Sequence, residues 1–292
     1  HDALPISATF SNAGAATAMG IQLVCLGTTL RFNELGSVLK RGGVLLISKF
    51  VAGAVIGIVV GKVFGTDGFL GLSALAIICA VTNSNGSVYL SLMQSYGDEV
   101  DCGAMALLSL NDGPFFTLVA MGASGLANIP ILSILAAITP IIVGMILGNL
   151  DKSFSDFLAP AGPILIPFVG LTLGAGIDLS AVIKGGPSGV LLGFMTTFIS
   201  GVFIVLCDRK ISKRPGYAGW AVATTAGNAV AVPAVVGLAD KSLEAYVPQA
   251  TAQVAASVVI TAILVPIVTN WWAHKYGCPK FPLEEKKTEA AK

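Results

Sequence analysis

Residues 69–95 read FLGLSALAIICAVTNSNGSVYLSLMQS, and the polar run TNSNGS (82–87) interrupts this apolar stretch near its centre. Asparagine, serine and glycine favour local turns over a continuous helix, so the sequence predicts a helix that breaks at this run. In the second half of the chain, the run TTAGN (224–228) interrupts the apolar stretch 216–238 in the same way. The two interruptions together predict a pair of broken helices.

The composition of the chain predicts a membrane protein. Its 292 residues are 54% hydrophobic and 11% charged, with a mean hydropathy of +0.83, whereas a soluble domain averages about 25% charged residues. A helix needs about 20 apolar residues to cross the hydrocarbon core of a bilayer. We therefore predict an all-α, polytopic membrane protein. The nine expected spans are 8–30, 44–64, 69–95, 100–122, 131–148, 156–177, 187–207, 216–238 and 246–271.

An internal repeat relates the two halves of the chain. One constant offset carries Gly42 onto Gly185, Thr82 onto Thr225 and Asn85 onto Asn228. Chance matching of small residues is the alternative explanation. If the repeat is real, each unit has five helices and the first unit lacks its leading helix. An odd number of helices turns the two units in opposite directions, so we predict an inverted repeat of five plus five helices with two broken helices that cross.

The basic residues orient the spans, because cytoplasmic loops carry an excess of lysine and arginine. One set of alternate loops and the C-terminal end of the chain hold most of them, namely Arg31, Lys40, Arg41, Lys152, Arg209, Lys210, Lys213, Arg214, Lys275 and four lysines of the polar tail 276–292. The opposite set holds Lys62, Lys184 and Lys241. We therefore expect a cytoplasmic C-terminus. At the other end, residues 1–6 (HDALPI) resemble the translated end of a sequencing-library adapter, so we expect them to be non-native.

The broken helices supply the candidate binding groups. A break leaves unpaired backbone N–H groups on one half-helix and unpaired carbonyls on the other, and these can bind anions and cations respectively. Amide and hydroxyl side chains at the breaks suit a polyhydroxylated carboxylate. The candidate substrate-binding residues at the breaks are Thr82, Asn83, Ser84, Asn85, Thr224, Thr225 and Asn228. Polar contacts between packed helices are the alternative role for these side chains.

Two charged residues lie well inside the expected spans, and Asp112 is the one acid among them. Asp112 follows Asn111 in span 100–122, and an acid this deep is costly unless it has a partner or faces a cavity. Asp112, with Asn111, is therefore the candidate for proton coupling, and a structural hydrogen bond is the alternative. Lys49 in span 44–64 is a candidate partner for a substrate carboxylate or for Asp112, unless it snorkels to the headgroups. Further candidates for lining a cavity are Gln249, Thr251 and Gln253.

Several classes of function find no support. The five cysteines have no paired spacing, and the two histidines, His1 and His274, lie outside the expected spans, so we expect no metal site and no histidine base at membrane depth. A P-loop, a Rossmann fingerprint and an HExxH motif are absent from the sequence, which argues against ATP-driven transport and against an enzyme. A net charge of +1 without a basic stripe argues against binding of nucleic acid. An ion channel or a receptor would not need two paired helix breaks, so the sequence favours a carrier over these classes.

Six stretches of the chain resemble the 2-keto-3-deoxygluconate permease family in their order and spacing, and the resemblance covers roughly residues 8–271. They are LGTTLRFNELGSVLKRGG (26–43), AVTNSNGSVYLSLMQSYGD (80–98), LSLNDGPFFTLVAMG (108–122), LGNLD (147–151), LIPFVGLTLGAGIDL (165–179) and TTAGNAVAVPAVV (224–236).

The resemblance implies a secondary active transporter that imports 2-keto-3-deoxygluconate, a sugar-acid anion, with protons across a bacterial inner membrane. It implies a fold similar to the bile-acid sodium symporters. The membrane domain would cover 7–275, with a scaffold at 8–30 and 131–177 and a core at 44–122 and 187–271. The implied partners are the substrate and the lipid bilayer, with no cofactor besides the coupling ion. A sodium-coupled organic-anion symporter of the same fold is the alternative, and a homo-oligomer is left open.

Overall fold

The computed structural model describes residues 12–30, 32, 35–65, 67–111, 113–162, 164, 165, 168 and 179–283. Every named element in these ranges is a helix, which confirms the all-α prediction. Helices suit lipid because they satisfy all backbone hydrogen bonds within one segment. In chain order the elements are α2 (Asn12–Gly27), α3 (Leu35–Phe64), α4 (Ala74–Thr82), α5 (Gly86–Tyr96), α6 (Glu99–Leu108), η1 (Ser109–Asn111), α7 (Phe115–Ser124), α8 (Ile131–Leu150), α9 (Lys152–Leu158), α11 (Leu179–Phe194), the π-helix η2 (Met195–Ser200), α12 (Gly201–Lys210), α13 (Tyr217–Val222), η3 (Gly227–Ala231), α14 (Val232–Ala239), η4 (Lys241–Tyr246) and α15 (Val247–Tyr276).

The protein is a multi-pass membrane protein. Six described segments are long and apolar enough to cross a bilayer, namely Leu39–Phe64, Ala74–Tyr96, Ile131–Leu150, Gly186–Lys210, Tyr217–Ala239 and Lys241–Tyr276. The helices of Glu99–Asn111 and Phe115–Ser124, bent by 58° relative to each other, pass the same test only when they are taken together as one span. Of the other two expected spans, 8–30 corresponds to the 16-residue helix α2, and 156–177 falls largely outside the described residues. The count of nine spans and the inverted repeat remain predictions.

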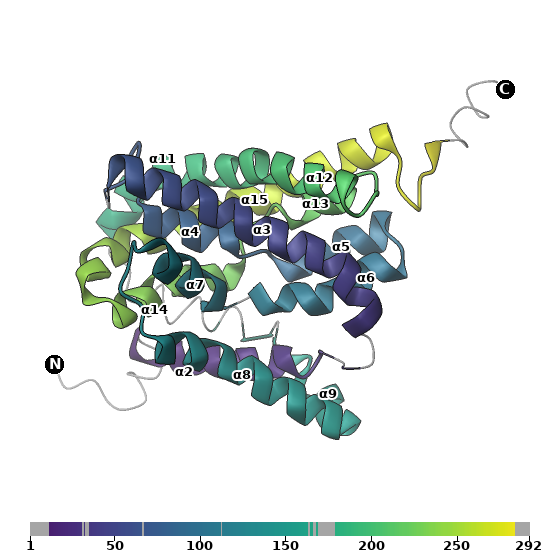
Figure 1. Cartoon of the computed structure of the whole chain (residues 1–292), viewed down its shortest axis with the longest axis horizontal. Helices are drawn as coiled ribbons and strands as arrows, with labels where there is room; N and C mark the ends of the chain where they lie inside the picture. The colour runs from purple at the N-terminus through teal and green to yellow at the C-terminus, as the bar shows by residue number, and fades with distance from the viewer. Residues whose placement is uncertain are drawn as a thin grey trace.

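Helices α2 and α8 pack side by side along one edge of the molecule (Figure 1). Their contact is close because Gly144 and Gly148 of α8 bring its backbone against that of α2. A Cβ atom on Gly144 would overlap the carbonyl of Val24, and one on Gly148 would overlap the backbone of Thr28. Small residues at such contacts allow membrane helices to approach at van der Waals distance.

Both predicted breaks are present, and the broken helices lie at the centre of the molecule. The first break separates α4 from α5 at residues 83–85, and the second separates α13 from η3 at residues 223–226. Every residue of α4 and of α13 is buried. Large apolar side chains of the surrounding helices are exposed instead, among them Ile47 of α3, Ile131 of α8 and Ile263 of α15. The outer helices therefore present an apolar surface to lipid and enclose the polar breaks.

Helix α3 begins at Leu35, well before the predicted start of the span at residue 44. The prediction counted Arg41 among the basic residues of a loop, and the structure instead buries this side chain in the second turn of α3, where it is only 4% exposed. The helix continues through Arg41 because two aspartates neutralise its charge, as described below.

Candidate functional site

The first break is closed by side chains that hydrogen-bond to its own helix and to α7. Asn83 Nδ2 donates to the carbonyl of Cys79 over 2.8 Å, and Thr82 Oγ1 donates to that of Ile78 over 2.7 Å. The hydroxyl oxygens of Thr82 and Thr117 lie 2.9 Å apart, and Asn83 Nδ2 lies 3.2 Å from Thr117 Oγ1. Thr82 and Asn83 therefore satisfy the carbonyls at the end of α4 and fasten this end to α7.

Asn111, one of the two predicted coupling residues, lies against the first break. Its Oδ1 accepts a hydrogen bond of 3.0 Å from Ser84 Oγ and a longer one of 3.4 Å from Ser84 N. Among the described residues, Asn83 Oδ1 and Asn111 Nδ2 are buried atoms that make no hydrogen bond. Asp112, the other predicted coupling residue, lies outside the described residues. The break in α4–α5 and the bend between η1 and α7 thus meet at Ser84 and Asn111.

The second break is connected to the first. Thr224 Oγ1 accepts a hydrogen bond of 2.7 Å from the backbone N–H of Asn85, and Lys49 Nζ donates to the carbonyl of Thr224 over 2.7 Å. Lys49 is fully buried, so it does not snorkel to the headgroups. The hydrogen bond instead places its Nζ atom on a carbonyl that the break leaves without a helical partner.

Thr225 fastens the second break to α15. Its backbone N–H donates to Thr261 Oγ1 over 3.0 Å, and its hydroxyl lies 2.7 Å from Ser257 Oγ. The two broken helices also pack against each other. Helix α5, the second half of the first broken helix, packs against α13, and α4, its first half, packs against η3 and α14. The first half of each broken helix therefore contacts the second half of the other.

A cavity of about 220 Å³ lies between α2 and the two breaks. It is lined by Gln22, Leu26, Asn85, Gly86, Ser87, Val88, Met105, Ala226, Gly227 and Asn228. None of these side chains is charged. The volume is slightly below the roughly 300–1,000 Å³ of pockets for drug-sized ligands, which suits a small organic molecule.

The N-terminus of α5 faces this cavity. Asn85 caps the helix, because its Oδ1 accepts a hydrogen bond of 3.1 Å from the backbone N–H of Val88. The first N–H groups of a helix have no acceptor within it, and the helix dipole adds a partial positive charge at this end. Gly86 and Ser87 occupy these first positions and line the cavity, so the site favours an anionic group.

The structure divides the predicted site residues into two groups. Asn85 and Asn228 line the cavity. The others do not line it and instead hold the breaks together, and these are Thr82, Asn83, Ser84, Thr224, Thr225 and Lys49. Of the further candidates, Gln253 Nε2 donates to Gly71 O over 2.6 Å and to Ser188 Oγ over 2.8 Å, and Gln249 Nε2 also donates to Gly71 O. These two glutamines connect α15 to neighbouring segments, as expected for polar contacts between helices.

The sequence analysis did not name Gln22, which lines the cavity from α2. The stretch 8–30 was expected to belong to the scaffold, and no binding residue was placed on it. Gln22 is fully buried, and its Nε2 donates to the carbonyl of Gly162 over 3.0 Å. A lone amide in the middle of an apolar stretch is the signal that points to it, since polar side chains at membrane depth face a partner or a cavity.

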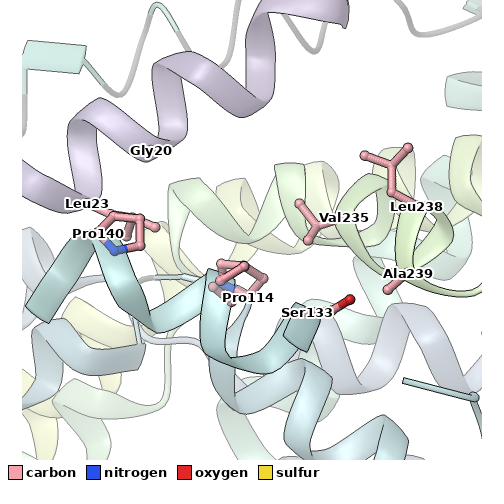
Figure 2. A pocket seen from close by; sticks show the side chains of 10 residues that line it. Gly20, Leu23, Pro114, Ser133, Pro140, Val235, Leu238 and Ala239 are labelled. Atoms are coloured by element: carbon pink, nitrogen blue, oxygen red, sulfur yellow. The ribbon is translucent and has the colours of Figure 1, made fainter. Parts of the chain in front are cut away.

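A second cavity, of about 300 Å³, lies along the other side of α2 (Figure 2). Gly20 and Leu23 of α2 border it, together with Ser133 and Pro140 of α8 and residues of α14. Its lining is mostly apolar. Both cavities therefore lie between α2 and the helices that carry the breaks, and α2 forms one wall of each.

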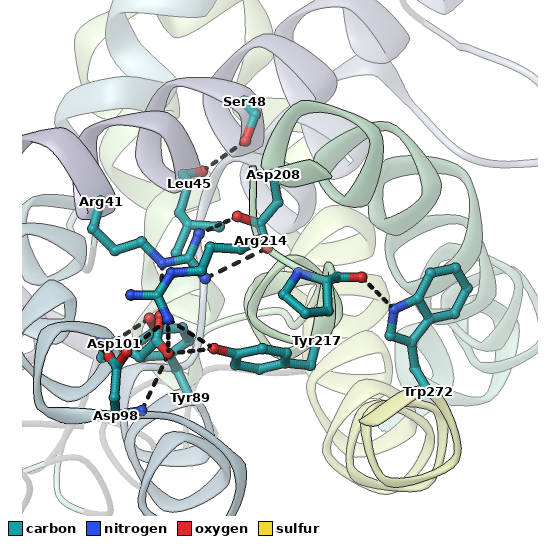
Figure 3. Close-up of polar contacts among 11 residues, drawn as sticks. Arg41, Leu45, Ser48, Tyr89, Asp98, Asp101, Asp208, Arg214, Tyr217 and Trp272 are labelled. Atoms are coloured by element: carbon teal, nitrogen blue, oxygen red, sulfur yellow. Dashed lines mark hydrogen bonds and ion pairs between the residues drawn. The ribbon is translucent and has the colours of Figure 1, made fainter. Parts of the chain in front are cut away.

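Figure 3 shows a network of buried charges that joins α3, α6 and α12. Arg41 of α3 pairs with Asp208 of α12 through Nη1, and its Nε donates to Asp101 Oδ1 of α6 over 2.6 Å. The two aspartates are fully buried. Sequence analysis considered Asp112 the one acid well inside a span, and it did not anticipate that Asp101 and Asp208, at span ends, would be buried with Arg41.

Two tyrosines and a second arginine complete this network. Tyr217 donates to Asp101 Oδ2 over 2.5 Å, and Tyr89 donates to the backbone carbonyl of Asp101 over 2.8 Å. Arg214 pairs with Asp98 over 2.6 Å and lies 3.7 Å from Asp101. Helices from both halves of the chain are thereby joined through Asp101.

Paired broken helices that enclose polar groups within a multi-pass bundle define a membrane carrier. The chain belongs to the 2-keto-3-deoxygluconate permease family, whose model matches residues 5–278. It is 47% identical over 269 residues to 2-keto-3-deoxygluconate permease 1 of Salmonella typhimurium, covering 92% of this chain and 84% of the relative. It is 37% identical over 283 residues to 2-keto-3-deoxygluconate permease of Enterobacter sp., covering 95% and 86%. The family is one of permeases, so the chain is a transporter and not an enzyme.

Proposed function

We propose that this transporter imports 2-keto-3-deoxygluconate by proton symport across a bacterial inner membrane, with its C-terminus in the cytoplasm. The observation that carries the proposal is the cavity of about 220 Å³ at the N-terminus of α5, whose lining, among the described residues, contains amides and no charged side chain. The names of the relatives support the choice of substrate, since each is called a 2-keto-3-deoxygluconate permease. A carboxylate at the helix N-terminus would receive N–H donors without competing with a protein acid.

In this proposal the substrate carboxylate binds the first N–H groups of α5, at Gly86 and Ser87. The amides of Asn85 and Asn228 both donate and accept, so they suit the keto and hydroxyl groups. Lys49 does not touch the substrate. Through Thr224 it holds a positive charge behind the break, which lowers the energy of an anion in the cavity.

Asp112 is the proposed proton carrier, and Asn111 connects its segment to Ser84 at the first break. An acid that is neutral when the anion enters makes proton binding and substrate binding favour each other, as symport requires. Helices α2 and α8 would belong to the static scaffold, and the helices around the breaks would form the mobile core. The close glycine contact between α2 and α8 supports treating these two as one unit.

A sodium-coupled organic-anion symporter of the same fold is the second candidate. It is favoured by Asn83 Oδ1, a buried amide oxygen at the first break that accepts no hydrogen bond from the described residues. Amide and carbonyl oxygens are the ligands that hard cations prefer.

The test is uptake of labelled 2-keto-3-deoxygluconate into vesicles, first under an imposed proton gradient and then under a sodium gradient. We expect accumulation with the proton gradient alone. Asp112→Asn should abolish accumulation but spare exchange of internal for external substrate, because exchange needs no net proton movement. Accumulation that follows sodium alone would overturn proton coupling, and accumulation by the Asp112→Asn variant would assign the proton to another group.

A further inference from the structure

We propose that Gln22 of α2 recognises a hydroxyl group of the bound sugar acid through its Oε1 atom. This inference rests on the proposed binding of a polyhydroxylated carboxylate in the cavity at the breaks. It adds a specificity-determining residue on the opposite wall, on a helix that carries none of the residues expected to bind substrate.

The orientation of the Gln22 amide follows from its neighbour. Nε2 donates a hydrogen bond of 3.0 Å to the carbonyl of Gly162, and a carbonyl can only accept. The amide nitrogen must therefore face Gly162, which leaves Oε1 as the atom of this amide without a hydrogen-bond partner.

Gln22 Oε1 is a buried acceptor without a donor. The side chain is fully buried, and no described residue donates a hydrogen bond to this atom. Buried polar atoms are nearly always hydrogen-bonded, and an exception calls for an explanation such as a binding role. Gln22 lines the cavity of about 220 Å³, so a donor on a ligand in that cavity would satisfy the atom.

The two walls of the cavity are chemically complementary. The wall at Gly86 and Ser87 offers backbone donors and a partial positive charge, whereas Gln22 on the α2 wall offers an acceptor. A ligand that satisfies both must have an anionic group at one end and a hydroxyl group at the other. A 2-keto carboxylate without hydroxyl groups would leave Gln22 Oε1 unsatisfied, and sites built for a hydroxyl discriminate strongly against analogues that lack it.

The test compares two ligands of equal chain length, 2-keto-3-deoxygluconate and 2-oxohexanoate, which lacks the hydroxyl groups. Affinities for the purified full chain in detergent are measured by titration calorimetry, with gluconate as a further hydroxylated carboxylate. We expect the protein to bind the hydroxylated ligands about 10- to 100-fold more tightly than 2-oxohexanoate. In Gln22→Leu we expect this ratio to fall at least about threefold, because the variant has no acceptor to leave unsatisfied, while the proposed hydroxyl contacts to Asn85 and Asn228 remain.

Gln253→Leu is the matched control. Gln253 is also fully buried, its Nε2 also donates to a backbone carbonyl, and its Oε1 also has no donor among the described residues, but it does not line the cavity. Gln253→Leu should lose about as much thermal stability as Gln22→Leu. It should keep the ratio of affinities between the hydroxylated ligands and 2-oxohexanoate. A merely structural role of Gln22 would change stability and leave the ratio unchanged.

The outcomes separate this inference from the proposed substrate. Tight binding of gluconate but not of 2-keto-3-deoxygluconate, with a lower ratio of gluconate to 2-oxohexanoate affinity in Gln22→Leu, would support Gln22 and overturn the proposed substrate. An unchanged ratio in Gln22→Leu would overturn the role of Gln22, whichever sugar acid binds. Equal affinity of the unsubstituted protein for the hydroxylated ligands and for 2-oxohexanoate would also overturn the role of Gln22.

Discussion

The backbone N–H of Asn85 donates a hydrogen bond of 2.7 Å to Thr224 Oγ1, across 139 positions of the chain. This bond joins the break of one helix to the break of the other, and the second break thereby satisfies a backbone group that the first leaves open. A chain that interrupts two helices at membrane depth must pair the freed backbone groups, because lipid offers them no partner. The contact between the breaks is therefore part of what makes them stable.

Thr224→Val should destabilise the protein, because valine has nearly the same shape but cannot accept the Asn85 hydrogen bond. Leaving the N–H without an acceptor should cost about 1–3 kcal/mol. The melting temperature in detergent measures the effect, and Thr224→Ser should retain most of the stability. Thr269→Val is the control, since Thr269 Oγ1 is buried and makes no hydrogen bond to the described residues. An equal loss in Thr269→Val would show that the hydrogen bond is not the cause.

Lys49→Met should weaken anion binding and also lower the stability of the second break. Lys49 Nζ is buried and donates to the carbonyl of Thr224, so methionine leaves that buried carbonyl unsatisfied, at a cost of about 1–3 kcal/mol. We expect affinity for a sugar acid to fall at least about tenfold, or ~1.4 kcal/mol, together with the melting temperature in detergent. Lys62→Met, at the exposed end of α3, should change neither quantity. Loss of stability without loss of affinity would mean that Lys49 only supports the second break.

The positions of both breaks could be predicted from local composition, since asparagine, threonine and glycine runs oppose helix wherever they occur. The partners of the polar groups could not be predicted, because they depend on how distant helices pack. Arg41 and Asp208 lie 167 positions apart, and each alone resembles a charge at the end of a span. Gln22 was overlooked for a related reason: its role depends on a cavity that four separate segments of the chain form together.

The pair formed by Arg41 and Asp208 gives a test of the buried network. Asp208→Leu leaves Arg41 buried with fewer partners, and Arg41→Met leaves two buried carboxylates without it, so each single variant should cost about 3–5 kcal/mol. The double variant should be less destabilised than the sum of the two, and a double-mutant cycle on melting in detergent measures this coupling. Asp156→Asn, which breaks the exposed pair with Lys152, is the control and should leave the melting temperature unchanged. Additive losses would show that the two residues act independently.

Asp98 connects the network to the solvent-exposed end of the bundle. Partial burial raises its pKa, but the backbone N–H of Asp101 and the guanidinium of Arg214 outweigh this effect, so its pKa lies below the ordinary value of 3.8. A carboxyl with a lowered pKa stabilises the folded state above its ordinary pKa, and this contribution disappears as the pH falls through the lower value in the folded protein.

Asp98→Asn should therefore lower the melting temperature at neutral pH and have little effect in strong acid. Asparagine can still accept the Asp101 N–H bond that caps α6, so the variant removes the charge and keeps the cap. Melting curves of the two proteins, recorded from pH 7 down to the lowest pH at which both stay folded, should converge below the ordinary pKa of 3.8. Convergence would attribute the stabilisation to the Asp98 carboxylate and its pairing with Arg214. A difference that persists through the acid range would attribute it to hydrogen-bond geometry that asparagine does not reproduce.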